Sequence, residues 1–497
     1  MSSNRLLYLL VFVVGTASLG AEIAAVRLMA PFFGASTIVW ANTIGVVLVA
    51  LSIGYWLGGR LGDRHPELRS LCLVILGAAV LLAVVPFVAQ PFFDISVDAL
   101  DEIQAGAFVG SLVGVLALIA IPVVLLGTCS PWAIRLAVPD VEHAGTVAGR
   151  LYAISTAGSL IGTLVAALVL VPFAGTQRTF LILAAVLALA AAAGLGWRFA
   201  AAPVALAAAI ALPVGTVKAT DEGTVLYEAE SQYQYIRVVE KENGDRVLEL
   251  NEGQATHSLY RPGSWLTRDY WDGLTVLPFV SLDRPPRRIA VLGNAAGTSA
   301  REYGHFFPRA RIDGVEIDPE LEEVGDRFFD MGSARNLTVH NEDARPWLRT
   351  SDGGFDVIVL DTYRQPYIPF YVATREFFEL VRDRLAPGGA VVVNVGHAPG
   401  NDDLEQAIGR TMAAAFPTVL RDPVEDSNTL LVASEAPASA NHLLRSIPLM
   451  PRALQRLAAV EGGRLEPRLD GGEVYTDDRA PVEWLIDRSI LGYAGDE

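Results

Sequence analysis

The stretch RIAVLGNAAGTSAREYG, residues 288–304, decides the fold of the second half of the chain. It begins as an apolar strand, passes through a glycine turn and ends as a helix. Further apolar strands follow, separated by helical sequence, in ARIDGVEID, LTVHNEDA, FDVIVLDTY and GGAVVVNVG. Strands that alternate with helices predict a doubly wound, Rossmann-like α/β domain of the methyltransferase-like kind, which we expect over residues 284–497.

The sequence upstream of this domain predicts two other parts. Residues 218–283 contain short alternating segments, including YIRVVEKENGDRVLELN, in which Asn243-Gly244 is a hairpin signal. We therefore expect a small β-strand domain there. Residues 1–217 are dominated by Leu, Val and Ala runs, which predict a bundle of transmembrane helices.

The composition is typical of a membrane half followed by a soluble half. The 497 residues are 52% hydrophobic and 19% charged. About 20 apolar residues cross a bilayer as a helix. Candidate spans are residues 6–26, 37–58, 70–90, 105–127, 150–172, 178–197 and 199–215. The last is short, so we expect six or seven spans in a multi-pass protein of the cell membrane, with the lipid bilayer as a partner.

The side of the membrane that carries the soluble half stays open at this stage. Arg60, Arg64 and Arg69 lie in one loop and favour the cytoplasm for it. Counted from this loop, seven spans place the soluble half outside the cell and six place it in the cytoplasm. A domain that uses an intracellular nucleotide favours the cytoplasmic side.

Charge and cysteine usage exclude two kinds of site. The net charge is -17, whereas nucleic-acid binding needs a basic surface. Cys72 and Cys129 lie in or beside apolar runs, and the sequence has no Cys/His cluster. We therefore expect neither a nucleic-acid partner nor a metal site.

Residues that follow the predicted strands are the candidate ligand-binding residues, because ligands of doubly wound sheets bind at the carboxyl ends of the strands. Gly293 and Gly297 allow a tight turn close to a ligand. Glu316 ends the next strand, about where an acid binds ribose hydroxyls. Asp343 follows the third strand, where it either accepts the amino group of an adenine or caps the helix that begins ARPWL. Together these residues predict an adenosine site of the S-adenosylmethionine kind.

Asp361 ends the fourth strand, in VIVLDTYRQPYIPFY, and should face the reacting end of a bound adenosine compound. A carboxylate there can take a proton from an attacking amine or hold that amine by its charge. Tyr363 and Tyr367 could line the binding site of an aliphatic cation. The structural alternative is that Asp361 caps a turn.

These segments resemble the spermidine synthase family, the aminopropyltransferases. ESQYQYIRV resembles the family's Ser-x-Tyr-Gln-x-Ile segment, which makes Gln234 a candidate ligand of the nucleoside. LELNEGQATHS resembles a segment that leads to a substrate-side Gln, here Gln254. GVEIDPE and NEDA, which ends at Ala344, are similar to the ribose and adenine segments, and FDVIVLDTY to the segment with the catalytic Asp, here Asp361.

The membrane half and the late YTDDRAPVEW extend the resemblance to the membrane-fused spermidine synthase-like proteins. The resemblance implies transfer of an aminopropyl group from decarboxylated S-adenosylmethionine to a small-molecule amine such as putrescine. It implies a cosubstrate and no tightly bound cofactor. A homodimer is a further expectation.

The sequence departs from the family at the amine side of the site. The family's glycine-loop Asp, which should bind the aminopropyl amine, is Ala296, and Arg364 and Gln365 stand where a second acid is expected. Asp477 or Asp478 is a candidate replacement. Loss of paired carboxylates weakens diamine binding, because ammonium groups that leave water need charged partners.

Two other functions stay open. The same nucleoside residues would serve an S-adenosylmethionine-dependent methyltransferase that acts on a membrane-associated acceptor. Ala296 in place of an acid would remove a repulsion toward the carboxyl-bearing methionine tail. The third reading is a non-enzymatic carrier or sensor, whose soluble domain binds a ligand and gates the helical bundle.

Overall fold

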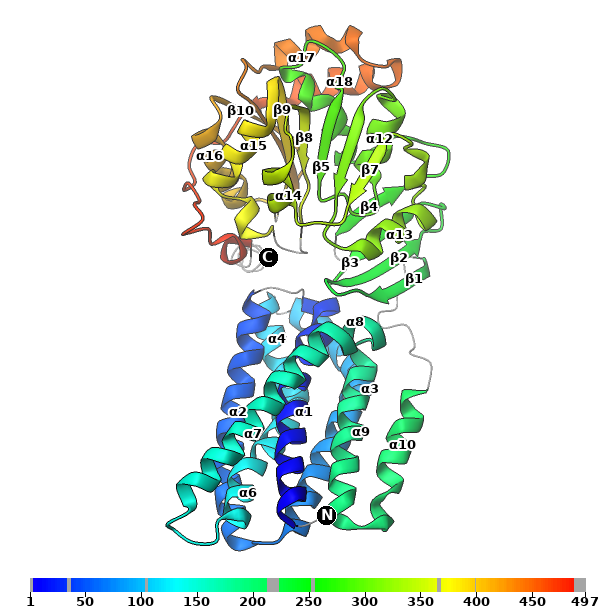
Figure 1. Cartoon of the computed structure of the whole chain (residues 1–497). Helices are drawn as coiled ribbons and strands as arrows, with labels where there is room; N and C mark the ends of the chain where they lie inside the picture. The colour runs from blue at the N-terminus through cyan, green and yellow to red at the C-terminus, as the bar shows by residue number, and fades with distance from the viewer. Residues whose placement is uncertain are drawn as a thin grey trace. The chain divides into compact units, whose positions relative to one another are not determined.

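The computed structural model describes residues 3–33, 37–102, 106–211, 223–251, 255–363, 368–397 and 399–486. The chain divides into two compact units (Figure 1). The first unit comprises Met1–Ala219 and the short segment Glu228–Tyr235. The second comprises Thr220–Tyr227 and Ile236–Glu497.

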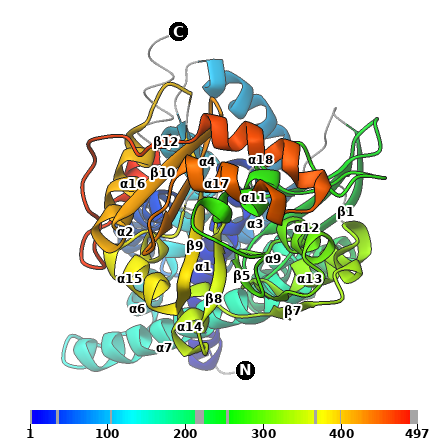
Figure 2. The same cartoon turned by 90° about the horizontal axis from the view of Figure 1, so that it is seen from above.

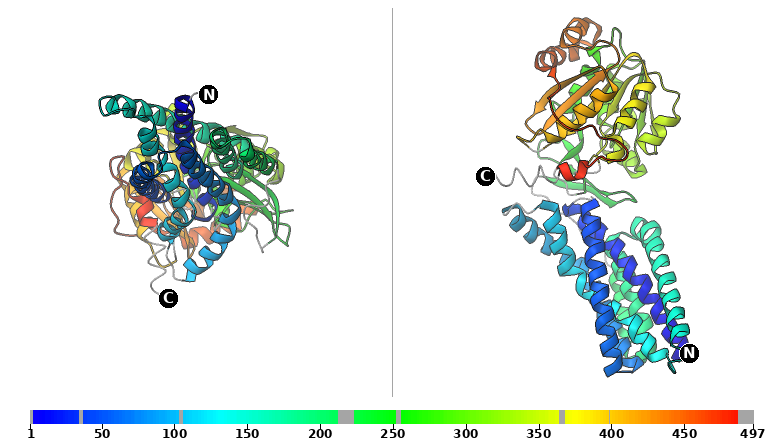
Figure 3. Two further views of the ribbon diagram at one scale, coloured as in Figure 1. Left: turned by 90° about the horizontal axis from the view of Figure 1, so that it is seen from below. Right: turned by 90° about the vertical axis from the view of Figure 1, so that its left-hand side faces the viewer.

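Long apolar helices build the first unit. They are α1 (Ser3–Phe33), α2 (Thr37–Arg64), α3 (Leu68–Glu102), α7 (Ala144–Val165) and α9 (Thr176–Leu195). Shorter helices connect or follow them: α4 (Gly106–Leu118), α5 (Ala120–Gly127), α6 (Cys129–Ala137), α8 (Val171–Ala174) and α10 (Ala201–Ile210). The left view of Figure 3 looks along several of these helices.

Six helical segments of the described chain are long and apolar enough to cross a membrane. They are Asn4–Phe33, Val39–Arg64, Leu68–Ala89, Ala120–Ala137, Ala144–Ala174 and Thr176–Leu195. The span predicted over 105–127 differs, because the helix is interrupted after α4 and the qualifying segment begins at Ala120. Within the predicted span 199–215 the structure shows α10, whose ten residues rise about 15 Å, roughly half the thickness of a bilayer core.

Glycines let the helices of this unit approach closely. A Cβ at Gly54 or Gly58 of α2 would overlap the backbone of the α5–α6 segment. A Cβ at Gly158 or Gly162 of α7 would overlap the backbone of α1. Each pair is spaced four residues apart, which is the pattern that allows helix backbones to pack against one another in membranes.

A small sheet precedes the large one, with the order β1-β2-β3-β4. Its strands are β1 (Thr224–Glu230), β2 (Tyr235–Glu240), β3 (Arg246–Leu250) and β4 (Thr256–Tyr260). β2 pairs antiparallel with β3, and β3 pairs antiparallel with β4. The hairpin predicted at Asn243-Gly244 is confirmed, with Gly244 at a φ of +83° in the turn.

The large sheet has eight strands in the order β12-β10-β11-β9-β8-β5-β6-β7. Its parallel strands are β5 (Arg288–Leu292), β6 (Arg311–Val315), β7 (Leu337–His340), β8 (Phe355–Leu360) and β9 (Leu385–Gly396). β10 (Thr418–Glu425), β11 (Asn428–Ser434) and β12 (Glu466–Pro467) are antiparallel. The predicted doubly wound fold is confirmed, and the C-terminal strands make the sheet mixed.

Side chains of the central strands alternate between two cores. Ile358 and Leu360 of β8 pack on one face with α14 (Ala344–Thr350), α15 (Arg375–Arg384) and α16 (Asp403–Ala415). Val357 and Val359 pack on the other face with helices from four segments. These are α11 (Tyr270–Val276), α12 (Thr298–Phe306), α17 (Ala440–Ser446) and α18 (Arg452–Arg464). Figure 2 shows α14 and α15 on one side of β8, and α11 and α12 on the other.

The strand order reverses between β5 and β8. These two strands are neighbours, although β6 and β7 lie between them in the sequence. Beyond their carboxyl ends, the N–H of Asp361 donates to the carbonyl oxygen of Leu292 at 2.9 Å. The glycine turn after β5 and the segment after β8 are therefore adjacent, at the place where doubly wound sheets bind their ligands.

Candidate active site

Backbone geometry fixes the glycine turn between β5 and α12. Gly293 and Gly297 have φ angles of +84° and +88°, in the left-handed region that favours glycine. A Cβ at Gly293 would overlap the backbone oxygen of Asp361, and one at Gly297 would overlap the side chain of Met331. The fold itself therefore requires both glycines, in addition to any room that they leave for a ligand.

Ala296 occupies an apolar pocket of this turn. It is fully buried and belongs to a cluster with Val238 and Leu248 of the small sheet and Leu321 of α13 (Pro319–Phe328). Its N–H donates to the hydroxyl of Ser258 at 3.0 Å. A carboxylate at this position would need a charged or hydrogen-bonding partner to offset its loss of water. The methyl group of Ala296 suits these surroundings without one.

Glu316 follows β6 and lies against the glycine turn. Its Oε2 accepts from the N–H of Ala295 at 2.8 Å, and its Oε1 accepts from the N–H of Asp318 at 3.1 Å. Burial raises the pKa of Glu316 to about 7, although the backbone hydrogen bonds act in the opposite direction. The predicted ribose acid and the predicted glycine turn are thus brought together.

Asp343 caps the N-terminus of α14, which is the structural role that the sequence offered as an alternative to adenine binding. Its Oδ1 accepts from the N–H of Arg345 at 3.0 Å, and its Oδ2 accepts from the hydroxyl of Tyr371 at 2.7 Å. Ala344 is the first residue of the helix. An ionised carboxylate has about four acceptor positions, so these two bonds leave capacity for a ligand.

Asp361 lies at the reversal point between two side chains from other segments. Tyr270 of α11 donates its hydroxyl to Oδ2 at 3.0 Å, and Asn394 of β9 donates its amide to Oδ1 at 2.8 Å. Burial raises the pKa of Asp361 to about 6, and hydrogen bonds from Asn394, Tyr270 and Trp271 lower it. A carboxyl that titrates just below neutral pH is ionised under physiological conditions and can still accept a proton.

Comparisons with known proteins identify the second half of the chain. The model of the spermine/spermidine synthase domain matches residues 270–422, a range that includes Tyr270, Asp361 and Asn394. A probable polyamine aminopropyl transferase of Bifidobacterium longum is 30% identical over 299 residues. A polyamine aminopropyltransferase of Corynebacterium efficiens is 28% identical over 450 residues, which cover 82% of this chain and 80% of that protein. The chain belongs to the polyamine aminopropyltransferase family.

The match to the Bifidobacterium protein covers 55% of this chain and 66% of that protein. Among solved structures, a probable spermidine synthase from Corynebacterium glutamicum is 21% identical, with a TM-score of 0.38, and covers 51% of this chain and 98% of that chain. The spermidine synthase from Thermotoga maritima is 17% identical, with a TM-score of 0.38, and covers 55% of this chain and 87% of that chain.

The sequence analysis missed Asn394 and Tyr270, whose side chains hydrogen-bond to the candidate catalytic acid of this aminopropyltransferase. Asn394 lies near the end of β9, so the strand-end rule that selected Asp361 would also have selected it. Tyr270 carries no comparable signal, because it comes from α11 outside the strand series. Its approach to Asp361 depends on how α11 packs against the sheet.

Three predicted binding residues of the aminopropyltransferase cannot be placed at the site, because two are outside the described residues and Gln234 belongs to the first compact unit. Gln254 and Tyr367 lie outside the described residues. Gln234 is buried in the turn between β1 and β2, where its carbonyl oxygen accepts from the N–H of Ser231 at 2.9 Å. Their roles stay predictions.

Tyr363 is described, and its hydroxyl is directed at β9. It accepts from the N–H of Gly396 at 2.5 Å and lies 3.3 Å from the carbonyl oxygen of Asn394, to which it donates. Burial raises the pKa of Tyr363. The hydroxyl therefore anchors the segment after β8 to β9, and only the ring is left to contact a substrate.

Asp477, a candidate replacement for the missing amine-side acid, is already paired. Its carboxylate accepts from the guanidinium of Arg345 at 2.6 Å and from the hydroxyl of Thr374 at 2.7 Å. These interactions lower the pKa of Asp477, with the Arg345 hydrogen bond as the largest cause. The geometry favours a structural ion pair over an amine site at this residue.

Among the residues that the structure describes, one group of possible metal ligands lies beyond the end of β9. His397, Asp402 and Glu405 have ligand atoms within 4.8 Å of one another. However, Glu405 accepts from Arg421 at 2.5 and 2.9 Å and from Thr429 at 2.9 Å. A guanidinium that already neutralises the central carboxylate makes this group a poor cation site.

Proposed function

We propose that the protein is a membrane-bound aminopropyltransferase that moves the aminopropyl group of decarboxylated S-adenosylmethionine to an amine such as putrescine. One observation carries this proposal. Asp361, the candidate catalytic acid, lies beside the glycine turn at the strand reversal, with hydrogen bonds from Tyr270 and Asn394. These residues fall in the range that the synthase domain model matches.

The chemistry is an in-line displacement at the carbon beside the sulfonium. The amine nitrogen forms the new bond to this carbon while the carbon–sulfur bond breaks, and the sulfur leaves with the electron pair as a neutral thioether. The amine proton passes to Asp361 and then to solvent. Alignment of donor and acceptor supplies most of the acceleration, because a positioned pair of substrates reacts as if intramolecular.

For the donor, we propose that Glu316 binds the ribose hydroxyls and that Asp343 binds the adenine amino group, next to Ala344. Gly293 and Gly297 would let the nucleoside approach the backbone. Gln234 would contribute from the small strand domain. The support is the contact between Glu316 and the glycine turn, and the acceptor positions that remain on Asp343.

For the acceptor, we propose that Gln254, Tyr363 and Tyr367 contact the amine while Asp361 receives its proton. Ala296 has no charge to offer the amino group of the transferred aminopropyl chain, and it lies in an apolar cluster. We therefore expect weaker binding of the donor's terminal ammonium than in a protein with a carboxylate at this position.

The arrangement along the chain is part of the proposal. Residues 1–217 would anchor the protein in the cell membrane, 218–283 would form the small strand domain, and 284–497 would carry catalysis. Six spans would leave the catalytic domain on the cytoplasmic side, where its nucleoside cosubstrate is made. A homodimer is proposed for the assembled enzyme.

Calorimetric titration of the purified full-length protein with decarboxylated and with intact S-adenosylmethionine tests this function. We expect tighter binding of the decarboxylated form, and turnover with that form and putrescine. In D361N, donor binding should persist, whereas turnover should fall by about 10²–10⁴-fold. Preference for the intact form, or unchanged turnover in D361N, would contradict the proposal.

A further inference from the structure

Two buried carboxyl groups face each other behind the candidate active site. Glu302 lies on α12 and is completely buried, and Asp272 lies on α11 and is only 4% exposed. The two side chains are within hydrogen-bonding reach of each other. Neither carboxyl oxygen of Glu302 has a hydrogen-bond donor among the described residues. Two ionised carboxylates cannot satisfy each other, because both only accept.

The surroundings of Glu302 favour its protonated form. Burial raises its pKa well above the ordinary value, and the charge and hydrogen bonding of Asp272 raise it further. Asp269 acts in the same direction, and only Arg301 opposes them. The Nε and Nη2 atoms of Arg301 make no hydrogen bonds in the described structure. Its guanidinium carbon lies over the rings of Tyr260 and Trp265, at 5.1 and 5.3 Å.

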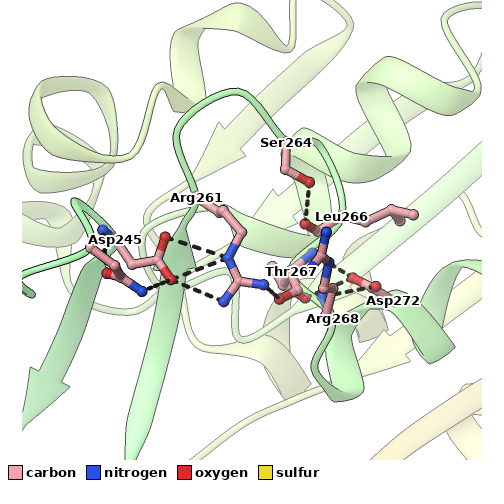
Figure 4. A network of polar contacts seen from close by, with 8 residues as sticks. Asp245, Arg261, Ser264, Leu266, Thr267, Arg268 and Asp272 are labelled. Atoms are coloured by element: carbon pink, nitrogen blue, oxygen red, sulfur yellow. Dashed lines mark hydrogen bonds and ion pairs between the residues drawn. The ribbon is translucent and has the colours of Figure 1, made fainter.

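The other acceptor positions of Asp272 are filled by one turn of the chain. Its Oδ1 accepts from the N–H and the hydroxyl of Thr267, both at 2.7 Å, and its Oδ2 accepts from the N–H of Arg268 at 3.0 Å (Figure 4). The φ of Arg268 is +61°, in the left-handed region that a side-chain-bearing residue adopts at a cost. Asp272 thus stabilises a strained turn.

This turn ends at the residue that contacts the candidate catalytic acid. Tyr270 comes two residues after Arg268, and its hydroxyl donates to Asp361 at 3.0 Å. Arg261 holds the other side of the turn: it donates to the carbonyl oxygen of Thr267 and is paired with Asp245 at 2.9 Å (Figure 4). The position of Tyr270 therefore depends on a turn supported by Asp245 through Arg261, and by Asp272.

We propose that the carboxyl group of Glu302 is protonated and donates a hydrogen bond to Asp272, and that this carboxyl pair positions Tyr270 against Asp361. Glu302 would be a positioning residue, because it is completely buried and acts on Tyr270 only through Asp272. It supplies the fourth hydrogen bond of Asp272, beside the three that Asp272 accepts from the turn. The tests of this inference that measure turnover rest on the proposed aminopropyl transfer, whereas the carboxyl pair itself does not.

Comparison of E302Q with E302L in the full-length protein tests the pair. The amide of E302Q can still donate to Asp272, whereas E302L offers no donor. We expect E302Q to keep most of the wild-type kcat and E302L to lose about ten- to a hundredfold, as a small misplacement of a reacting group does. Equal impairment of the two variants would overturn the proposal.

The pH profile separates positioning of Tyr270 from a general loss of stability. The hydrogen bond from Tyr270 lowers the pKa of Asp361, so its loss must raise that pKa. The acid limb of kcat/KM in E302L should therefore move to higher pH, as in Y270F, and Y270F/E302L should show no further shift. An unmoved limb in folded E302L would overturn the proposal. So would fully additive shifts in the double variant.

An infrared difference spectrum between wild type and E302Q at neutral pH needs no turnover. We expect a carbonyl band of a neutral carboxylic acid in the wild type that is lost in E302Q. This measurement decides the protonation of the pair even if E302L does not fold. Absence of the band overturns the proposed pair, whereas absence of turnover in the wild type overturns the proposed function alone.

Discussion

At the scale of single residues, Asp361 is a carboxyl whose surroundings balance two opposing effects. Burial raises its pKa to about 6, and hydrogen bonds from Asn394 and Tyr270 limit the rise. Proton acceptance requires the ionised form. Activity should therefore be lost as the pH falls through about 6, and it should be retained above that value.

Substitution of Asn394 tests this balance. In N394A, one hydrogen bond to the ionised form is lost, so the pKa of Asp361 should rise and the acid limb of kcat/KM should move to higher pH. N341A is the control, because Asn341 is exposed and bonds to Glu322. A limb that shifts equally in both variants, or in neither, would show that Asn394 does not tune Asp361.

The sequence predicted the strand-end acids but not their partners. Glu316, Asp343 and Asp361 follow strands, and the alternation of strands and helices is readable in the residues. Tyr270 and Glu302 act through packing between helices that are separate in the sequence. No local pattern records which buried side chains of two such helices meet. Only the folded structure brings Glu302 beside Asp272.

At the scale of elements, the turn after β5 is set by backbone sterics. Replacement of Gly293 by Ala combines left-handed strain with an overlap on the backbone of Asp361. Gly400 has a φ of +73° and open space around its missing Cβ, so G400A carries the strain alone. Strain of this kind costs about 1–2 kcal/mol.

We therefore expect G293A to unfold at a lower temperature than G400A and to lose turnover, which thermal unfolding and steady-state assays would measure. G400A should keep its turnover. Equal melting temperatures would mean that the β5 turn can shift away from Asp361 without loss.

The packing of α2 provides a second comparison of two glycines, which here are adjacent in the sequence but have different surroundings. A Cβ at Gly58 would meet the backbone of Thr128, whereas one at Gly59 meets nothing within 4 Å. G58V should lower the thermal stability of the detergent-solubilised protein well below that of G59V, since helix separation removes packing contacts. Similar stabilities would argue against close contact of α2 with the α5–α6 segment.

Element type was largely predictable, and element direction was not. The spacing of apolar residues and the turn residues between them predicted the hairpin at Asn243-Gly244 and the parallel strands from β5 to β9. The same signals give no direction for β10 to β12, because a buried strand has the same pattern in either orientation. The interruption of the helix near Ile119 could not be predicted from the sequence either, because the neighbouring residues are uniformly apolar.

At the scale of the whole molecule, the count of crossings determines where the C-terminus lies. If all six qualifying segments of the described chain cross the membrane, both termini lie on the same side, and the arginine-rich loop after α2 favours the cytoplasm for that side. A fluorescent protein fused at the C-terminus should then fold and fluoresce, and an alkaline phosphatase fusion should be inactive. The reverse pattern would mean that residues 199–215 complete a seventh crossing.

The outer strands β12 and β10 of the eight-stranded sheet limit how copies of the protein can associate along that edge. β12 covers only Leu420 and Arg421 of β10, and β10 carries Pro423 and an irregularity before Glu425. Proline and bulges at an edge prevent a foreign strand from adding to it, so they guard against aggregation and amyloid-like growth. Association of copies along this edge would then have to proceed through side chains, and concentrated preparations should resist fibre formation from this edge.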